Sequence, residues 1–184
     1  MNNLDSIGIL GGGIAGLTLG CTLLQEGIPA IIFEQSSEVS SFGAGISLSK
    51  NALRLLYRLN IYEDLFNRSF APSKVLIQGP IEAISEFSAP TGMLATRRQE
   101  LINCLLERYL SLGGEIFYDH SLKTYNQVTR EIAFKNDTKY TINHLAACDG
   151  IRSSIRDTFF TINQKPKYRG YSASRGVGLS LIHI

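Results

Sequence analysis

Apolar residues recur at helical spacing in four segments of the chain, and these segments predict its helices. Helices are expected over residues 14–26, from an N-cap at Ser49 through Leu59, over residues 62–67, and from Arg98 to a C-cap at Gly113 and Gly114. The last helix is the most regular, because its apolar residues form one face: Leu101, Ile102, Leu105, Leu106, Tyr109 and Leu110. Apolar stripes of this kind face the core of a protein.

Short apolar runs between the helices predict strands. They are expected at residues 29–33, 75–77, 93–96, 115–118 and 144–148, with antiparallel strands over 121–142 that turn near Asn136 and Asp137. Residues 35–48 are rich in serine and glycine and are expected to form a loop. Pro72, Pro80 and Pro90 separate the runs of residues 72–96, which indicates a second layer outside the main one. The remaining strands alternate with helices, as is typical of the α/β class.

Three glycines stand where the first apolar run ends and the first helix begins. Gly11, Gly13 and Gly16 have the spacing G-x-G-x-x-G of dinucleotide-binding turns. In such turns the first glycine allows a tight bend, the second lets the backbone approach a pyrophosphate, and the third lets the helix pack closely on the strand. The pyrophosphate then lies at a helix N-terminus, where free N–H groups and the helix dipole favour an anion.

An acidic residue follows this turn at the distance that the same interpretation requires. Glu34 ends the predicted strand at 29–33, about 20 residues beyond the glycines, where a carboxylate would accept hydrogen bonds from ribose hydroxyls. The alternative is a glycine-rich turn in an ordinary β-α-β unit, which explains the glycines but not Glu34.

Length, charge and cysteine content narrow the class of protein. The 184 residues suffice for about one domain, or for one domain and part of another. A net charge of +2 without a basic run gives no argument for nucleic-acid binding. Cys21, Cys104 and Cys148 are scattered without metal-ligand spacing, which favours a reduced cytoplasmic protein without a metal site. Residues 7–24 carry no charge, but their glycines favour the nucleotide-binding turn over a membrane span or signal peptide.

Four motifs follow one another along the chain. They are the glycine turn with Glu34 and Gln35; residues 43–48 (GAGISL) with 51–53 (NAL); residues 98–101 (RQEL); and residues 148–150 (CDG) with Ser153 and Arg156. In this order they resemble the FAD-dependent aromatic-ring monooxygenases, the family of salicylate-type, hydroxybenzoate-type and hydroxynicotinate-type hydroxylases. A looser match follows at residues 168–171 (YRGY). The resemblance covers nearly the whole chain.

The resemblance implies a fold, two cofactors and a set of contacts. The fold is a Rossmann-like, three-layer FAD-binding domain of the GR2 type, formed by residues 1–71 and 97–160. Residues 72–96 and 161–184 begin a second, mostly antiparallel substrate sheet. The cofactors are FAD and NAD(P)H, and the reactants are O₂ and a small aromatic substrate. The implied FAD contacts are Gly11, Gly13, Ile14, Ala15, Gly16, Glu34, Gln35, Gly45, Arg98, Leu122 and Asp149.

Several of these residues also have an ordinary structural interpretation. Arg98 is either a phosphate clamp or a solvated charge at a helix start, and its neighbour Arg97 fits the second interpretation better. Asp149 either bonds the cofactor or fixes its own loop. Ser153 and Arg156 equally suit a capped helix with a surface arginine.

No side chain is assigned a catalytic role, because the hard steps of flavin chemistry belong to the cofactor. Ser47 is interpreted as a loop serine, although it faces the substrate side in some members of the family. The histidines His120, His144 and His183 are scattered, and we interpret them as structural or surface residues.

The chain also departs from the family pattern. No Gly-Asp pair follows Gly150, although the family has one there for the flavin's ribitol and pyrophosphate, and residues 178–184 match nothing expected. We therefore interpret the chain as an N-terminal fragment that is inactive by itself. Two other functions stay open: an FAD-dependent epoxidase or reductase for an isoprenoid or quinone-type substrate, and a non-catalytic dinucleotide-binding module. The oligomeric state stays open as well.

Overall fold

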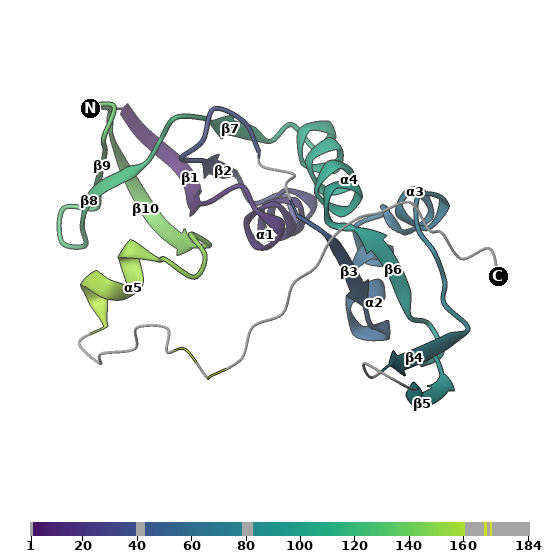
Figure 1. The fold of residues 1–184 in the computed structure, drawn as a ribbon. Coiled ribbons are helices and arrows are strands. Elements are labelled where there is room, and N and C mark those ends of the chain that lie inside the picture. Colours follow the sequence, from purple (N-terminus) through teal and green to yellow (C-terminus); the bar gives the residue numbers. More distant parts are fainter. Residues whose placement is uncertain (1, 40–42, 79–82, 161–167, 169, 171–184) are drawn as a thin grey trace. The chain divides into compact units, whose positions relative to one another are not determined.

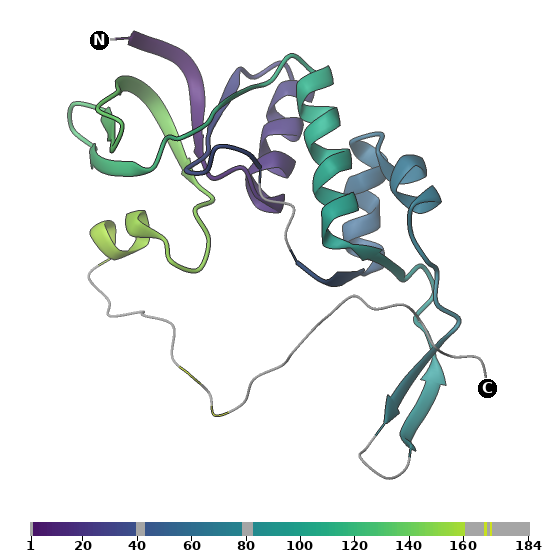
Figure 2. The same cartoon turned by 45° about the horizontal axis from the view of Figure 1, so that its top comes forward.

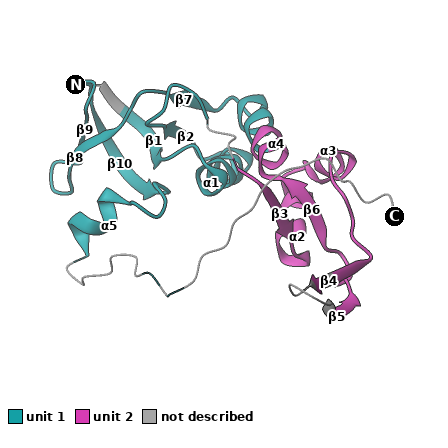
Figure 3. Ribbon diagram, in the orientation of Figure 1, with its two compact units in different colours: residues 1–40, 105–172 teal, residues 41–104, 173–184 magenta. Residues whose placement is uncertain are grey.

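A computed structural model of the chain describes residues 2–39, 43–78, 83–160, 168 and 170. It contains two compact units, which are coloured separately in Figure 3. The first unit comprises Met1–Ser40 and Leu105–Ser172, and the second comprises Ser41–Cys104 and Ala173–Ile184. The division into a cofactor domain and a substrate domain, with boundaries at 71/72 and 96/97, stays a prediction. The two units are described separately below.

A six-stranded sheet forms the framework of the first unit (Figure 1). Its order is β7-β2-β1-β10-β9-β8. The bounds are β1 Asn2–Leu10, β2 Ala30–Phe33, β7 Glu115–Phe117, β8 Leu122–Asn126, β9 Glu131–Phe134 and β10 Lys139–Ala147. Strands β7, β2, β1 and β10 are parallel, whereas β8 and β9 join the sheet in antiparallel pairing. The predicted α/β class is therefore confirmed.

The two long helices follow the predicted segments closely. Helix α1 (Ile14–Gln25) crosses from β1 to β2. Helix α4 (Arg98–Ser111), whose residues up to Cys104 belong to the second unit, leads into β7. The backbone of Gly113 has a left-handed φ of 82°, and its N–H donates to the carbonyl of Leu110, which ends α4 at the predicted C-cap. Helix α5 (Ser154–Phe159) follows β10.

The core of the sheet is apolar on both parallel and antiparallel strands. Its buried members come from β1, β2, β9 and β10: Leu10, Ile31, Phe33, Ile132, Phe134 and Ile142. The rings of Phe33 and Phe134 stack with centroids 4.8 Å apart, which joins the parallel part of the sheet to the antiparallel part. This contact holds the carboxyl end of β2, and with it Glu34, in a fixed position.

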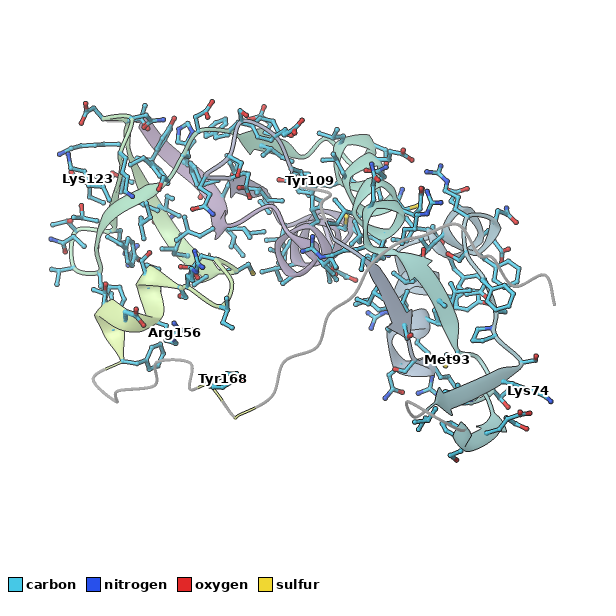
Figure 4. All side chains as sticks on the ribbon, viewed as in Figure 1. Lys74, Met93, Tyr109, Lys123, Arg156 and Tyr168 are labelled. Atoms are coloured by element: carbon cyan, nitrogen blue, oxygen red, sulfur yellow. The ribbon has the colours of Figure 1, made fainter. Side chains whose placement is uncertain are left out.

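Tyr109 of α4, labelled in Figure 4, packs between two glycines of the same unit. A Cβ atom at Gly20 of α1 would lie 2.6 Å from the ring atom Cε2, and one at Gly114 would also overlap the ring. The tyrosine is completely buried, and its hydroxyl lies 2.9 Å from the carbonyl oxygens of Ala30 and Glu115. Since a hydroxyl has one proton, it donates to one of these carbonyls at a time.

The second unit contains two small antiparallel sheets (Figure 2). One pairs β3 (Gly45–Leu48) with β6 (Leu94–Arg97), and the other pairs β4 (Lys74–Gln78) with β5 (Ala83–Ser88). Helices α2 (Lys50–Arg58) and α3 (Tyr62–Asn67) pack on each other, and α2 also contacts β3. Both helices lie where the hydrophobic spacing predicted them.

Two sequence-based predictions of local structure are wrong. Residues 45–48 were expected in a loop but form β3, because β6 supplies the pairing partner of this short segment. The strand expected at residues 144–148 is the second half of the longer strand β10, whose first residues pair with β9 and whose length pairs with β1. Among the described residues, no helix is both long and apolar enough to cross a bilayer.

Candidate nucleotide-binding site

The glycine turn between β1 and α1 has a backbone that only glycine adopts without strain. Gly11 has a φ of 99°, and its N–H donates to the carbonyl of Phe33 at 2.8 Å. A Cβ atom at Gly11 would lie 2.5 Å from the carbonyl oxygen of Cys148. The loop that follows β10 therefore closes directly on the turn, and any other residue at position 11 would push them apart.

The two remaining glycines of the motif have opposite surroundings. A Cβ atom at Gly16 would overlap the carbonyl oxygen of Gly11, so this glycine lets α1 approach the turn. A Cβ atom at Gly13 would meet no atom of the described residues within 4 Å, apart from its chain neighbours and its own helix backbone. Gly16 is thus required by the protein's own packing, whereas the protein's packing gives no reason for a glycine at position 13.

Gly13 is the N-cap residue of α1, and this helix end is suited to an anion. No side chain caps the helix, and its first turn contains no acidic residue. Ile14 is half-buried and Ala15 is exposed in that turn. The first N–H groups of a helix have no partner within it, and the helix dipole makes this end positive. The open space at Gly13 therefore lies where a phosphate group would approach the backbone.

Glu34 is buried at the carboxyl end of β2, with 9% of its surface exposed. Its Oε2 accepts the N–H of Gly12 at 2.7 Å, and its Oε1 accepts the N–H of Ser36 at 2.9 Å. A buried carboxylate needs such donors, because an uncompensated charge is costly inside a protein. A carboxylate accepts about four hydrogen bonds, so these two leave capacity for a ligand's hydroxyl groups.

Gln35 and Leu122 are two further predicted contacts in the first unit. Gln35 is exposed directly after Glu34. Leu122 opens β8, opposite Phe134 of β9, and its side chain packs against the core. A contact of Leu122 with a nucleotide through its backbone is compatible with this packing. The roles of both residues toward a cofactor stay predictions.

The loop after β10 is held by its own side chains. Oδ2 of Asp149 accepts the N–H of Ser154 at 3.0 Å, and Oγ of Ser153 accepts the N–H of Arg156 at 3.0 Å as the N-cap of α5. Arg156, labelled in Figure 4, donates to the carbonyl of Ile151 and to Asp157. These contacts fix the loop and cap the helix, as the ordinary structural interpretation of Asp149, Ser153 and Arg156 expects. A bond from Asp149 to a cofactor stays a prediction.

The second unit holds the two remaining predicted contacts close together. Gly45 is the register partner of Arg97 in the β3–β6 pair, and the N–H of Arg98 donates to the carbonyl of Ala44 at 3.1 Å. Arg98 is half-buried, while Arg97 and Ser47 are exposed. A Cβ atom at Gly43 would lie 2.8 Å from Cδ of Arg98, so the stem of this arginine packs over a glycine.

The histidines and cysteines differ in their surroundings. His144 is exposed on β10, His120 packs among aromatic rings, and His183 lies outside the described residues. The three cysteines are free thiols. Burial, followed by the charge of Asp149, raises the pKa of the Cys148 thiol. In the described part of the chain, no group of three histidine, cysteine or acidic side chains is arranged to hold a metal ion.

Sequence reasoning found the glycines and Glu34 but missed what joins them. The N–H of Gly12 bonds the carboxylate of Glu34, and the carbonyl oxygen of Cys148 lies against Gly11. Both are backbone groups, so no characteristic side chain points to them. Such contacts are made by backbone groups, which nearly every residue has, so the sequence gives no sign of them. The spacing of G-x-G-x-x-G gives no role to Gly12, the residue that meets the carboxylate.

Comparison with known proteins agrees with this geometry. The chain matches the FAD binding domain family over residues 4–171 and belongs to that family. The 6-hydroxynicotinate 3-monooxygenase of Pseudomonas fluorescens is 28% identical over 193 residues, covering 96% of this chain and 48% of that protein. A 3-amino-4-hydroxybenzoate 2-monooxygenase of Streptomyces platensis is 26% identical, covering 96% of this chain and 46% of that protein.

A solved structure supports the same assignment. The tetrameric form of 2-methyl-3-hydroxypyridine-5-carboxylic acid oxygenase superposes with a TM-score of 0.76 at 26% identity, covering 86% of this chain and 42% of that one. The resemblance seen in the motifs is therefore confirmed. The chain spans about half the length of the curated relatives it matches.

Proposed function

We propose that this chain belongs to an FAD-dependent, NAD(P)H-using monooxygenase that hydroxylates a small aromatic or related planar substrate with O₂. The observation that carries the proposal is the open, uncapped N-terminus of α1 at Gly13, set beside the buried carboxylate of Glu34. The relatives named above, which are monooxygenases and an oxygenase of aromatic acids, support the reaction class. The three free thiols are in keeping with a cytoplasmic protein.

The residues of the first unit fit the ADP half of FAD. The N–H groups of α1 would receive the pyrophosphate above Gly13, and Glu34 would accept the hydroxyls of the adenosine ribose. Gly11 and Gly16 shape the turn without meeting the ligand through a side chain. Gln35, Leu122 and Asp149 are proposed as further contacts, and so are Gly45 and Arg98, with Arg98 offering a charged fork for a phosphate.

Bound FAD would supply the redox chemistry, by accepting a hydride from NAD(P)H and activating O₂. This chain's own residues would bind the FAD and orient it. Glu34 holds the glycine turn through Gly12, and this bond would preorganise the phosphate site. Preorganisation of this kind lowers the cost of ordering a site on binding.

The test is a flavin spectrum and a turnover screen on the full-length protein. The purified protein is expected to be yellow and to oxidise NADH or NADPH faster when hydroxylated aromatic acids are added, with a hydroxylated product in the mass spectrum. Gly13→Val serves as the matched control without flavin. The 184-residue chain made alone is expected to give no turnover, because it has only half the length of its relatives.

Colourless protein that binds no added FAD would overturn the proposal. Flavin-bound protein that turns over a quinone or isoprenoid instead of any aromatic acid would replace it with the epoxidase or reductase alternative. Flavin-bound protein that oxidises no nicotinamide cofactor would favour the non-catalytic module.

A further inference from the structure

His120 occupies an unusual place for a histidine, inside a cluster of aromatic rings. Its ring centroid lies 4.8 Å from that of Phe134, 5.6 Å from Phe117, 5.7 Å from Phe33 and 5.9 Å from Tyr140. A phenylalanine would fill this space with less desolvation of polar atoms. The ring nitrogens of His120 therefore need an explanation other than packing.

Both ring nitrogens of His120 have partners, and one of these partners requires a proton on Nδ1. Nδ1 lies within hydrogen-bond distance of the backbone carbonyl of Tyr118. A carbonyl only accepts, so Nδ1 carries a proton and donates. Nε2 lies 3.4 Å from the hydroxyl of Tyr140, which can donate to this nitrogen or accept from it.

The bond from Nδ1 to Tyr118 closes a tight bend over residues 118–120. Asp119, at the centre of this bend, has a left-handed φ of 57°, which is uncommon for a residue other than glycine. Its carbonyl accepts a hydrogen bond from the side chain of Asn136 at 3.0 Å. The bend is therefore held by two side chains, one of which is His120.

This bend holds the turn that carries Glu34. The N–H of His120 donates to the carbonyl of Glu34 at 2.8 Å, and the N–H of Asp119 donates to the carbonyl of Ser36 at 3.1 Å. The N–H of Glu34 itself donates to the carbonyl of Phe117. Three backbone bonds thus connect residues 117–120 to residues 34–36, in addition to the contacts of the carboxylate with Gly12 and Ser36.

We propose that His120 is a positioning residue for the nucleotide-binding carboxylate of Glu34: its Nδ1–H fixes the 118–120 bend, and the bend fixes the Glu34 turn. The inference rests on the proposed function, because it gives the carboxylate the adenosine ribose as its ligand. His120 acts through the backbone and touches neither the glycine turn nor the ligand. Its ring is needed as a donor, and not only as an aromatic filler.

Two substitutions separate these two roles in the full-length protein. His120→Phe keeps the aromatic volume and removes the Nδ1 donor, whereas His120→Asn keeps a donor at the place of Nδ1 and removes the ring. We expect His120→Phe to raise the dissociation constants of FAD and of ADP about tenfold, the scale of one lost hydrogen bond. We expect His120→Asn to restore most of this affinity. Tyr140→Phe removes only the partner of Nε2 and is expected to leave both constants unchanged.

The controls are His144→Phe and His144→Asn, which change an exposed histidine on β10 and should leave binding unaltered. The imidazole ¹⁵N resonances of His120 provide a second readout, in which a protonated Nδ1 is expected. The tautomer with its proton on Nε2 would overturn the inference. So would wild-type affinity in His120→Phe, or an equal loss of affinity in both variants together with a lower melting temperature. Wild-type protein that binds neither FAD nor ADP would overturn the proposed function, and the inference with it.

Discussion

The carboxylate of Glu34 accepts the backbone N–H of Gly12 over 2.7 Å, although 22 residues separate the two in the chain. This bond connects the carboxyl end of β2 to the glycine turn that follows β1. Besides the ligand contact proposed for it, Glu34 therefore also holds the shape of this turn. Changes at Glu34 should consequently affect the protein both with and without nucleotide.

The first prediction concerns Glu34. Glu34→Ala should weaken FAD binding by about 1–3 kcal/mol, the scale of lost charged hydrogen bonds, and should also lower the melting temperature of the protein without flavin. Glu34→Gln should be nearly as harmful, because its amide N–H₂ would face the N–H of Gly12 or of Ser36. Titration of FAD fluorescence and thermal unfolding measure the two effects. Unchanged FAD affinity in Glu34→Ala would remove this residue from the proposed site.

The second prediction contrasts two glycines of one motif. Gly13→Val should end FAD binding while the melting temperature without flavin stays near that of the wild type, because the new side chain extends into space that none of the described side chains fills. Gly16→Ala should destabilise the protein itself, since its Cβ overlaps the carbonyl oxygen of Gly11. Flavin absorbance of the purified variants and thermal unfolding distinguish the two. A Gly13→Val protein that purifies with full flavin occupancy would show that no phosphate lies there.

The third prediction concerns Tyr109 and the glycine below its ring. Gly20→Ala should destabilise the protein by about 1–3 kcal/mol, because its Cβ would lie 2.6 Å from Cε2 of Tyr109. In a Tyr109→Leu background the same change should become neutral or stabilising by up to about 1 kcal/mol, since alanine is the better helix former. Urea unfolding of the four proteins in this cycle measures the coupling. Equal effects of Gly20→Ala in both backgrounds would mean that the ring does not require the glycine.

The fourth prediction concerns stability at alkaline pH. Burial raises the pKa of the Cys21 thiol from its ordinary value of 9.0 to about 11. The unfolded thiol therefore ionises first as the pH rises, so the unfolded state binds fewer protons and the free energy of unfolding falls between about pH 9 and pH 11. The loss from this group is at most about 3 kcal/mol. Burial also raises the pKa of the Tyr109 hydroxyl to about 12. Its ionisation therefore lowers the free energy of unfolding further at higher pH.

Urea unfolding at several pH values between 8 and 11 measures how steeply the free energy of unfolding falls with pH. Cys21→Ala is the matched variant, and its stability should fall less steeply over the same range, whatever its stability at neutral pH. Parallel slopes in the two proteins would show that the Cys21 thiol ionises equally in the folded and unfolded states.

The sequence by itself determined the features that depend on local spacing. Helical periodicity located α2, α3 and α4 because the apolar face repeats within each helix, and the left-handed C-cap at Gly113 needs only neighbouring residues. The glycine spacing and Glu34 allowed nucleotide contacts to be predicted, because the size of a pyrophosphate and a ribose sets the distances between their contacts. The family followed from the order of these local motifs.

Only the tertiary structure decided the features that depend on a distant partner. Residues 45–48 form a strand because β6, far along the chain, offers a paired edge, and four residues have too little pattern of their own. Strand β10 is continuous because β1 pairs with it from Tyr140 to Ala147, while β9 pairs with its first residues on the other edge.

The same reason explains the contacts of Gly12, Gly20 and His120. Gly12 meets a carboxylate through its N–H, Gly20 lies against a ring on another helix, and His120 bonds the backbone of a neighbouring bend. None of these contacts has a sequence signal, because in each case the partner is either distant along the chain or a backbone group, which looks the same at every position. Its role is decided by what the folded chain brings within hydrogen-bond or packing distance.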